Sequence, residues 1–304
     1  MTDDGVIPPF DALPRLPGNG VQHAWDVWGR GDNLGTLNRL TGPVVAAASS
    51  CVRTGERIGV SLPLGLPDPA FFGRKGFRHN FVAMGPAAWD DFVDGFYLQC
   101  SSQWDGLRHI GTPDGWYGGW RAQPTDDLEP LGIHHWARGI VGRGVLVDLA
   151  SYASAADPAY DPFARVTFTP ADLVAALAAQ GTSLRGGDIL CVRTGWTDKY
   201  LTLDAAGRTA LADSMKDLSG YTSAGLAGSE EMARFLWDSG SRRCPATTRP
   251  SRWSRPTGRS GSCTGGSSPA SGWRSVSCSR SATSPRRARG RDATSSCSWR
   301  CRST

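Results

Sequence analysis

The last 64 residues of this chain lack almost every residue type from which a hydrophobic core is built. Between Ser241 and Thr304 there is no Leu, Ile, Met, Phe or Tyr, and Val276 is the only valine. Lys, His, Asn, Gln and Glu are absent too, and Asp292 is the only acidic residue. Such a segment cannot bury enough apolar surface to offset the entropy lost on ordering, so we expect no fold for residues 241–304.

The same segment is rich in arginine, serine and cysteine. It holds 14 Arg, 17 Ser and 5 of the 8 Cys, and its formal charge is therefore +13, whereas residues 1–240 carry −8. The net charge of +5 thus misrepresents the main part of the chain. A basic tail is typical of nucleic-acid binding, a rival function that predicts an affinity falling steeply with salt. Such tails usually mix Lys with Arg, and we predict neither a nucleic-acid nor a membrane partner.

This composition is typical of a GC-rich gene translated out of frame. In a shifted frame, Ala246 to Trp253 can encode Asp-Asn-Pro-Ala-Leu-Glu-Val, and Ser260 to Ser279 regains Phe, Leu, Ile and His. We interpret residues 241–304 as an Arg/Ser-rich out-of-frame tail that follows a frameshift near Ser239 to Arg243. A genuine disordered Arg/Ser tail is the alternative.

Residues 1–240 are long enough for one large domain, and no Pro/Ser-rich linker divides them. Cys51, Cys100 and Cys191 form no CxxC pair, which argues against a disulfide scaffold and a zinc ribbon. The acidic N-terminus lacks an apolar leader, and no run approaches about 18 apolar residues. We therefore predict a cytoplasmic protein with a single domain over residues 1–240.

Local signals predict alternating helices and strands, and so an α/β fold. Thr169-Pro170-Ala171-Asp172 combines an N-cap, a proline at the first helical position and an acid in the first turn. Leu173, Val174 and Leu177 follow at helical spacing, and Gly181 is expected to close this helix. Further predicted elements are helices starting at 41–43 and 229–231 and strands at 58–62, 144–149 and 188–194.

The densest group of polar side chains lies at residues 99–109, Gln-Cys-Ser-Ser-Gln-Trp-Asp-Gly-Leu-Arg-His. If 97–103 is a strand, Gln99 and Gln103 share one face, Asp105 continues it, and His109 follows after a turn at Gly106. These groups could hold a hard divalent ion or orient a water molecule. A buried polar hairpin that satisfies its own hydrogen bonds is the alternative.

Segment 99–109 resembles the His-x-Gly-Thr-His-x-Asp-x-Pro-x-His signature of the cyclase family that includes bacterial kynurenine formamidase and isatin hydrolase. By position, Gln99 and Gln103 take the places of the two histidine ligands, Asp105 that of the ligand aspartate and His109 that of the catalytic histidine. Only Asp105 and His109 match in residue type. Further resemblance lies at 32–38, 143–148, 187–190 and 193–196, and it covers roughly residues 20–240.

The resemblance implies a swivelling β/β/α-type single domain with a mixed central sheet, assembled as a homodimer or homotetramer. It also implies a metal-dependent, arylformamidase-like hydrolase of a small cyclic or aryl amide, the type of reaction that occurs in tryptophan catabolism. The expected cofactor is Mn²⁺, Zn²⁺ or Mg²⁺, weakly held or absent, because amide oxygens replace imidazoles. A late His and a late Glu that bind metal in the family have counterparts only in the shifted frame, so we expect the metal site of this chain to be incomplete and the hydrolase to be inactive as written.

Three aromatic residues, Trp104, Trp116 and Tyr117, are candidates to line the pocket of a planar substrate, although loop packing explains the last two equally well. Asp90, Asp91 and Asp94 are expected on a solvated acidic loop. The alternative function is a non-catalytic protein that retains the pocket and binds a small molecule.

The frameshift interpretation predicts the nucleotide sequence around codon 240. Resequencing the gene from independent clones should reveal an insertion or deletion near codons 239–243, with a downstream frame that restores apolar residues. A single uninterrupted frame in every clone would refute the interpretation.

Overall fold

The computed structural model describes residues 7–122, 130–216 and 221–240. The tail at 241–304, for which we expect no fold, lies outside the described residues. The α-helices are α1 Gly42–Ala48, α2 Leu149–Ala156, α3 Pro170–Ala179, α4 Trp196–Thr202, α5 Ala205–Ser214 and α6 Glu230–Ser239. The strands are β1 Arg78–Gly85, β2 Ala88–Asp94, β3 Gly144–Asp148, β4 Thr167–Phe168, β5 Ile189–Arg193 and β6 Gly225–Leu226. Five short 3₁₀ helices, η1 Phe10–Ala12, η2 Gly35–Arg39, η3 Ser49–Cys51, η4 Tyr117–Gly119 and η5 Ile133–Trp136, complete the described elements.

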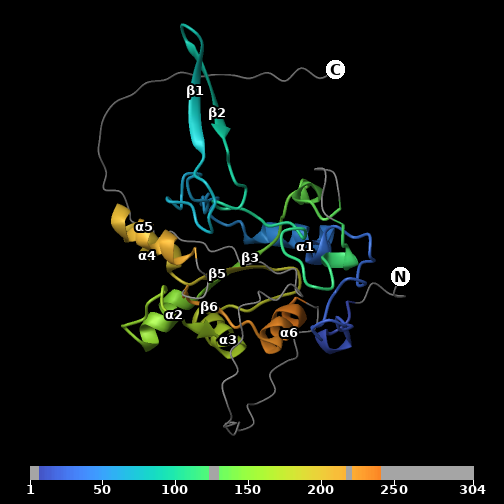
Figure 1. Cartoon of the computed structure of the whole chain (residues 1–304). Helices are drawn as coiled ribbons and strands as arrows, with labels where there is room; N and C mark the ends of the chain where they lie inside the picture. The colour runs from blue at the N-terminus through green and yellow to red at the C-terminus, as the bar shows by residue number, and fades with distance from the viewer. Residues whose placement is uncertain (1–6, 123–129, 217–220, 241–304) are drawn as a thin grey trace.

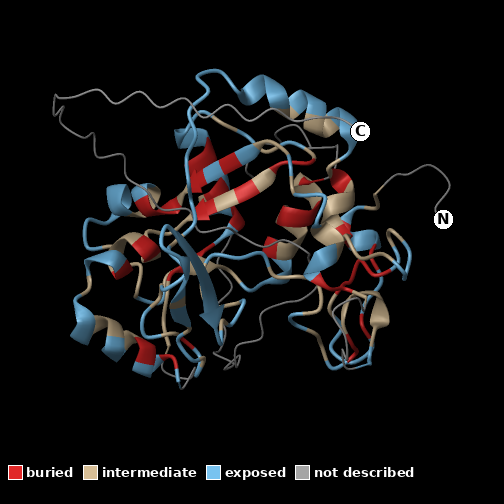
Figure 2. Cartoon of the chain, turned by 90° about the horizontal axis from the view of Figure 1, so that it is seen from above, coloured by how far each residue is buried: buried red, intermediate tan, exposed pale blue. Residues whose placement is uncertain are grey.

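The main core is built around the parallel pair β3 and β5, which confirms the two strands expected at 144–149 and 188–194. Alternate residues point inward, so that Val145 and Val147 on β3 and Leu190 and Val192 on β5 are buried. Helices α2, α3 and α6 supply the apolar residues that cover them. Figure 2 shows the buried residues concentrated in these central strands and in the neighbouring helices.

The strongest helix signal in the sequence is confirmed. Thr169 caps α3 through a reciprocal capping box with Asp172, and Thr182 N–H donates to the Leu177 carbonyl beyond Gly181, which has φ +66°. Leu173 and Leu177 are buried as expected, but Val174 is 52% exposed, because it lies about 100° around the helix from Leu173.

A second core joins the start of the chain to its last described helix. Trp237 of α6 packs with Phe10, Leu13 and Ala24, and its indole N–H donates to the Pro8 carbonyl at 2.8 Å. Ser229 caps this helix, which confirms the start expected at 229–231. Throughout the described ranges, every helix is too short or too polar to cross a bilayer.

The mixed α/β class is confirmed. The described strands form three two-stranded sheets: antiparallel β1–β2, parallel β3–β5 and parallel β4–β6. The swivelling β/β/α arrangement stays a prediction. The strands expected at 58–62 and 97–103 are wrong, because both segments are irregular and bond to each other mainly through side chains.

The acidic loop expected at Asp90, Asp91 and Asp94 is also wrong. These residues lie in β2, which pairs with β1 in a hairpin that projects from the body (Figure 1). Acidic residues are rare in strands, and the prediction failed because cross-strand partners bind two of them: Arg78 forms an ion pair with Asp94 at 2.8 Å, and His79 Nε2 lies 2.7 Å from Asp91 Oδ2.

His23 gives the fold a defined pH dependence. Burial lowers the pKa of this 6% exposed side chain, and the Trp25 N–H donates to its Nδ1 at 3.3 Å, which requires an unprotonated Nδ1. The nearby charges of Asp26 and Asp114 oppose the effect of burial, and that of Arg30 adds to it. The folded state therefore favours the neutral ring.

We expect stability to fall as the pH drops below about 6.5, where the unfolded chain begins to take up a proton that folded His23 resists. The loss amounts to about 1.4 kcal/mol for each unit of pKa difference. Urea unfolding at pH 7.5 and pH 5.5 should show a smaller change for His23→Gln than for the parent chain. Equal changes in the two proteins would contradict the prediction.

Candidate functional site

Segment 99–109 is held on one side by residues 62–74. Arg74 Nη1 donates to the Gln99 carbonyl at 2.7 Å, and the Leu62 N–H donates to Ser102 Oγ at 2.8 Å. Ser101 Oγ in turn donates to the Pro63 carbonyl at 3.1 Å. These hydrogen bonds link residues 25 to 40 positions apart, so local periodicity in the sequence could not predict them.

On its other side, segment 99–109 is held by Leu131. The Arg108 N–H donates to the Leu131 carbonyl at 3.2 Å, and a Cβ on Gly106 would lie 3.1 Å from that same oxygen. Only glycine allows this close approach without displacing a neighbour. Leu131 itself is 3% exposed and has φ +67°, a left-handed conformation that is costly for leucine and must be imposed by its surroundings.

The loop at residues 32–38 imposes that conformation. Asn33 Oδ1 accepts the Leu131 N–H at 2.7 Å, and the Asn33 carbonyl accepts the indole N–H of Trp136 at 2.9 Å. Asp32 Oδ2 accepts the Gly35 N–H at 2.6 Å and the Tyr117 hydroxyl at 2.9 Å. Asp32 and Asn33 thus connect two distant segments, at Tyr117 and at residues 131–136, beside the candidate site.

Asp105 and His109 face each other. His109 Nε2 lies 4.0 Å from Asp105 Oδ1, and the two side chains are 31% and 13% exposed. The turn in which the His109 N–H donates to the Gly106 carbonyl brings them together, as the sequence predicted. A carboxylate at this distance can orient an imidazole, and a small further approach would make a hydrogen bond. The His109 side chain is the more exposed of the two, whereas Asp105 Oδ1 is buried.

The other predicted site residues are placed differently. Gln103 is exposed and Gln99 half-buried, and they lie in irregular chain rather than on one strand face. The Tyr117 hydroxyl is committed to Asp32, and burial together with that carboxylate raises the pKa of Tyr117, so it stays a neutral donor. Trp116 packs over Gly111, where a Cβ would lie 2.9 Å from the indole. For Trp116 and Tyr117 the geometry agrees with the loop-packing alternative.

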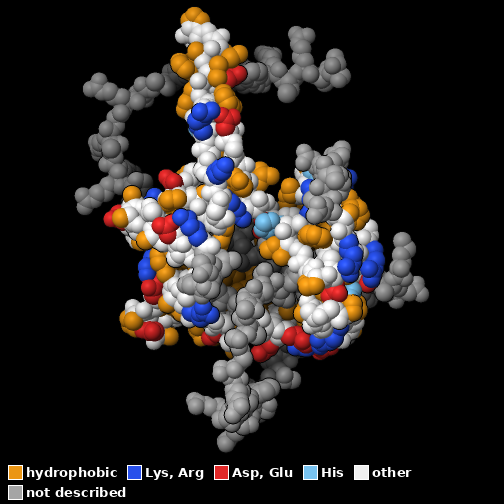
Figure 3. Space-filling view, viewed as in Figure 1, with side chains coloured by type: hydrophobic (Ala, Val, Ile, Leu, Met, Phe, Trp, Pro, Cys, Tyr) orange, Lys and Arg blue, Asp and Glu red, His pale blue; other side chains and the backbone are white. Residues whose placement is uncertain are grey.

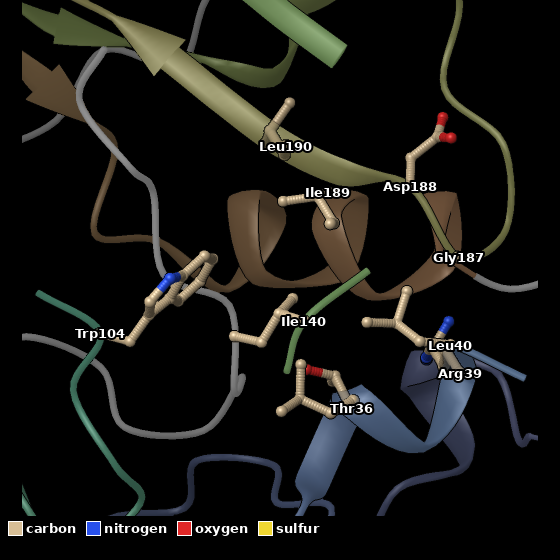
Figure 4. A pocket seen from close by; sticks show the side chains of 10 residues that line it. Thr36, Arg39, Leu40, Trp104, Ile140, Gly187, Asp188, Ile189 and Leu190 are labelled. Carbon is tan, nitrogen blue, oxygen red and sulfur yellow. The ribbon is translucent and has the colours of Figure 1, made fainter. Parts of the chain in front are cut away.

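Trp104 lines a pocket beside the candidate site. The pocket is shallow, with a cavity volume of about 50 Å³. Figure 4 shows Trp104 on the side opposite Arg39 and Leu40, with Ile140 between them and the start of β5 above. The walls are mainly apolar: Leu37, Leu40, Trp104, Ile140, Ile189 and Leu190. A planar apolar molecule suits such walls.

Arg39 is a residue of this pocket that the sequence analysis missed. It is 6% exposed, its guanidinium stacks on Trp237 at 4.5 Å, and Nη1 donates to the Trp237 carbonyl at 3.3 Å. Burial lowers the pKa of Arg39 to about 10, which leaves it charged at neutral pH. Its Nε and Nη2 find no hydrogen-bond partner in the described part of the chain. No pattern in the sequence around Arg39 indicates that its guanidinium is buried.

The donor set of the site can be compared with that of a metal centre. Within residues 7–122, 130–216 and 221–240, no group of three or more His, Cys, Asp or Glu side chains lies close enough to hold an ion. Asp105 is the one carboxylate among the predicted ligands, and exposed Gln103 and half-buried Gln99 offer only neutral amide oxygens. These residues do not amount to a complete metal centre.

Comparisons with known proteins confirm the family resemblance noted in the sequence. The family model described as "Putative cyclase" matches residues 66–247, an interval that contains segment 99–109 and ends close to the start of the 241–304 tail. A solved crystal structure described as a novel cyclase is 30% identical to the chain, with a TM-score of 0.53. The match covers 61% of this chain and 66% of that one, so it spans slightly less than two thirds of the similar structure. No curated protein matches the chain.

The support that Asn33 gives to Leu131 can be measured. Asn33→Ala leaves the N–H of a buried residue without its acceptor, and we expect a loss of about 1–3 kcal/mol in the free energy of unfolding. Asn19→Ala is the matched control, because Asn19 Oδ1 accepts the Val21 N–H at 3.0 Å in an exposed turn. Urea unfolding that gives equal losses for the two variants would contradict the role of Asn33.

Proposed function

Because the chain belongs to the cyclase family, we propose that it is a hydrolase of a small cyclic or aryl amide in which His109 is the general acid and base. Family membership supports a general hydrolase-like function. The choice of a formamide or lactam as the substrate, and of an arylformamidase-like reaction, is more specific than family membership supports. It is supported mainly by the 4.0 Å approach of Asp105 and His109 in a partly open, polar turn.

The proposed reaction uses the two side chains in fixed roles. Asp105 orients His109 through Nε2, which leaves Nδ1 to remove a proton from a water molecule. The resulting hydroxide attacks the amide carbonyl carbon, and His109 then passes the proton to the leaving nitrogen as the C–N bond breaks. An aryl formamide gives formic acid and an arylamine, whereas a lactam opens to one molecule that carries both the carboxylic acid and the amine. Such proton transfer typically supplies about 10²–10⁴-fold in rate.

Trp104 supports the choice of substrate class. Its indole forms one wall of the apolar pocket and directly precedes Asp105 in the chain, and the flat face of an aryl group could lie against it. In this proposal the domain also has the swivelling β/β/α arrangement implied by the resemblance. Residues 1–240 as one domain and a cytoplasmic location stay predictions.

A metal ion stays a separate prediction. When bound, it would polarise the carbonyl and lower the pKa of the attacking water. Since the described donors are incomplete, the roles of Asp105 and His109 are argued without it. Elemental analysis of the purified chain, and activity before and after dialysis against a chelator, test the predicted Mn²⁺, Zn²⁺ or Mg²⁺.

Variants of the pair test the proposed function. His109→Gln and Asp105→Asn should each lower kcat/KM for N-formylkynurenine or isatin by about 10²-fold or more, with little change in unfolding temperature. Asp213→Asn is a matched control, because Asp213 forms an exposed ion pair with Lys216 at 2.7 Å on another part of the surface. Full activity in His109→Gln would overturn the proposal.

The apolar pocket also favours the alternative function, a binding protein without catalysis. A ligand that raises the unfolding temperature of the full chain, without turnover of any formamide or lactam, would support that alternative. Filling the pocket by Ile140→Trp should then abolish the thermal shift. Turnover that depends on His109 would decide for the hydrolase.

A further inference from the structure

Arg39 is a buried charge to which no acid among the described residues is hydrogen-bonded. On the surface, basic and acidic side chains lie close together at several places (Figure 3), and ion pairs such as Arg15–Glu230 and Arg30–Asp26 form there. Arg39 is only 6% exposed, yet its pKa of about 10 keeps it charged at neutral pH. Burying a charge without hydrogen-bond partners is costly, so a ligand that supplies those partners would be favoured there.

The free nitrogens of Arg39 form one edge of its guanidinium group. Nη1 donates to the Trp237 carbonyl at 3.3 Å, and the guanidinium carbon lies 4.5 Å from the centre of the Trp237 ring. Nε and Nη2, which have no partner in the described chain, share another edge of the planar group. The N–H bonds on such an edge are parallel, so one carboxylate can accept a hydrogen bond from each nitrogen. Trp237 thus holds the group in place and leaves a bidentate edge free.

The pocket that Arg39 lines limits the size of the group that can enter. Its volume is about 50 Å³. On this measure a water molecule needs about 10–15 Å³, so the pocket has room for a few non-hydrogen atoms but not for a whole aromatic ring. Trp104 forms the wall opposite Arg39 (Figure 4) and is 37% exposed. A carboxylate therefore fits inside, and a ring attached to it would lie at the mouth against Trp104.

The charges around the pocket favour a single negative charge. Asp188, the acidic residue of the lining, is already paired: its oxygens accept from Arg143 Nε at 2.9 Å and Nη2 at 3.0 Å. The Arg185 N–H also donates to Asp188 Oδ2, at 2.6 Å. Asp238 attracts Arg39 without a hydrogen bond to its free edge. One guanidinium with two free N–H groups suits a planar carboxylate better than a doubly charged phosphate, which needs more donors.

We propose that Arg39 binds the carboxylate of an aromatic acid, whose ring lies against Trp104. Nε and Nη2 each donate a hydrogen bond to one carboxylate oxygen. Asp105 directly follows Trp104 in the chain, so the substrate of the hydrolase is an aryl amide that also carries a carboxylate. This last step rests on the proposed function, whereas binding of the aromatic acid does not.

Binding requires a small opening of the pocket. Both free nitrogens are shielded from water in the described conformation, so a carboxylate reaches them only after a side chain of the wall has shifted. The two charge-assisted hydrogen bonds offset that cost. Because such a ligand binds the folded chain and not the unfolded one, it also raises the unfolding temperature.

The test compares benzoate with benzamide, which has the same shape and no charge. Calorimetric titration of the full chain should give a Kd for benzoate about 10–100-fold lower than that for benzamide, because hydrogen bonds to charged groups are the stronger ones. Arg39→Lys keeps the charge but loses the paired edge. We expect it to bind benzoate about tenfold more weakly or worse, with benzamide binding unchanged. Equal affinities of the parent chain for the two compounds, or no binding of benzoate, would overturn the proposal.

Two further variants keep the test decisive if Arg39→Lys does not fold. Ile140→Trp fills the pocket without changing Arg39 and should abolish benzoate binding. Arg30→Lys is the matched control, because Arg30 also lies over a tryptophan ring, that of Trp25 at 6.0 Å, but is paired with Asp26; it should bind benzoate as the parent does. Benzoate binding that survives in Ile140→Trp would contradict a site in this pocket.

Inorganic phosphate is the competing anion. Displacement of benzoate by phosphate at equal concentration would overturn the assignment to a carboxylate, and benzoate that stays bound supports it.

Hydrolysis is measured separately, with 2-formamidobenzoate and formanilide as substrates. A higher kcat/KM for 2-formamidobenzoate, lost in Arg39→Lys, supports the substrate class. Benzoate binding that depends on Arg39, without turnover of either compound, supports the binding site and contradicts the proposed function. Turnover that depends on His109, with no preference for the carboxylate, leaves the proposed function standing and refutes the substrate class inferred from Arg39.

Discussion

The geometry of the candidate site depends on one hydrogen bond, from the Leu131 N–H to Asn33 Oδ1 at 2.7 Å. It holds a buried leucine in a left-handed conformation that leucine alone would avoid. That conformation directs the Leu131 carbonyl at the Arg108 N–H, next to His109, and allows Gly106 to approach. The position of His109 relative to Asp105 is therefore set by Asn33, which lies 72 positions before Asp105, just ahead of η2.

The parts of the fold that the sequence predicted are those with local causes. Thr169 and Ser229 cap helices through backbone groups three residues away, and strands β3 and β5 show an apolar run bounded by glycine. The pairing of Asp105 with His109 was predicted for the same reason, since only a turn at Gly106 separates them. The path of segment 97–103 could not be predicted, because hydrogen bonds from Leu62 and Arg74 determine it.

The β1–β2 hairpin could not be predicted from the sequence for a different reason. Alternating patterns reveal a strand when one face is buried and the other solvated. In β1 and β2, apolar residues occur on both faces, and the acids Asp90, Asp91 and Asp94 interrupt them, so the segment resembled a solvated loop. A ribbon with exposed apolar residues on both faces lacks that periodicity, so a search for alternation could not find it.

Arg39 lowers the stability of the last turn of α6. The guanidinium lies against Trp237 near the end of this helix, with two of its nitrogens deprived of acceptors among the described residues. When the last turn of α6 opens, water can hydrate those nitrogens, and the energy recovered offsets part of the cost of opening. Amide protons of this turn should consequently exchange with solvent by local fraying, before the β3–β5 pair opens. We therefore expect the end of the helix that closes the N-terminal core to loosen while the main core stays intact.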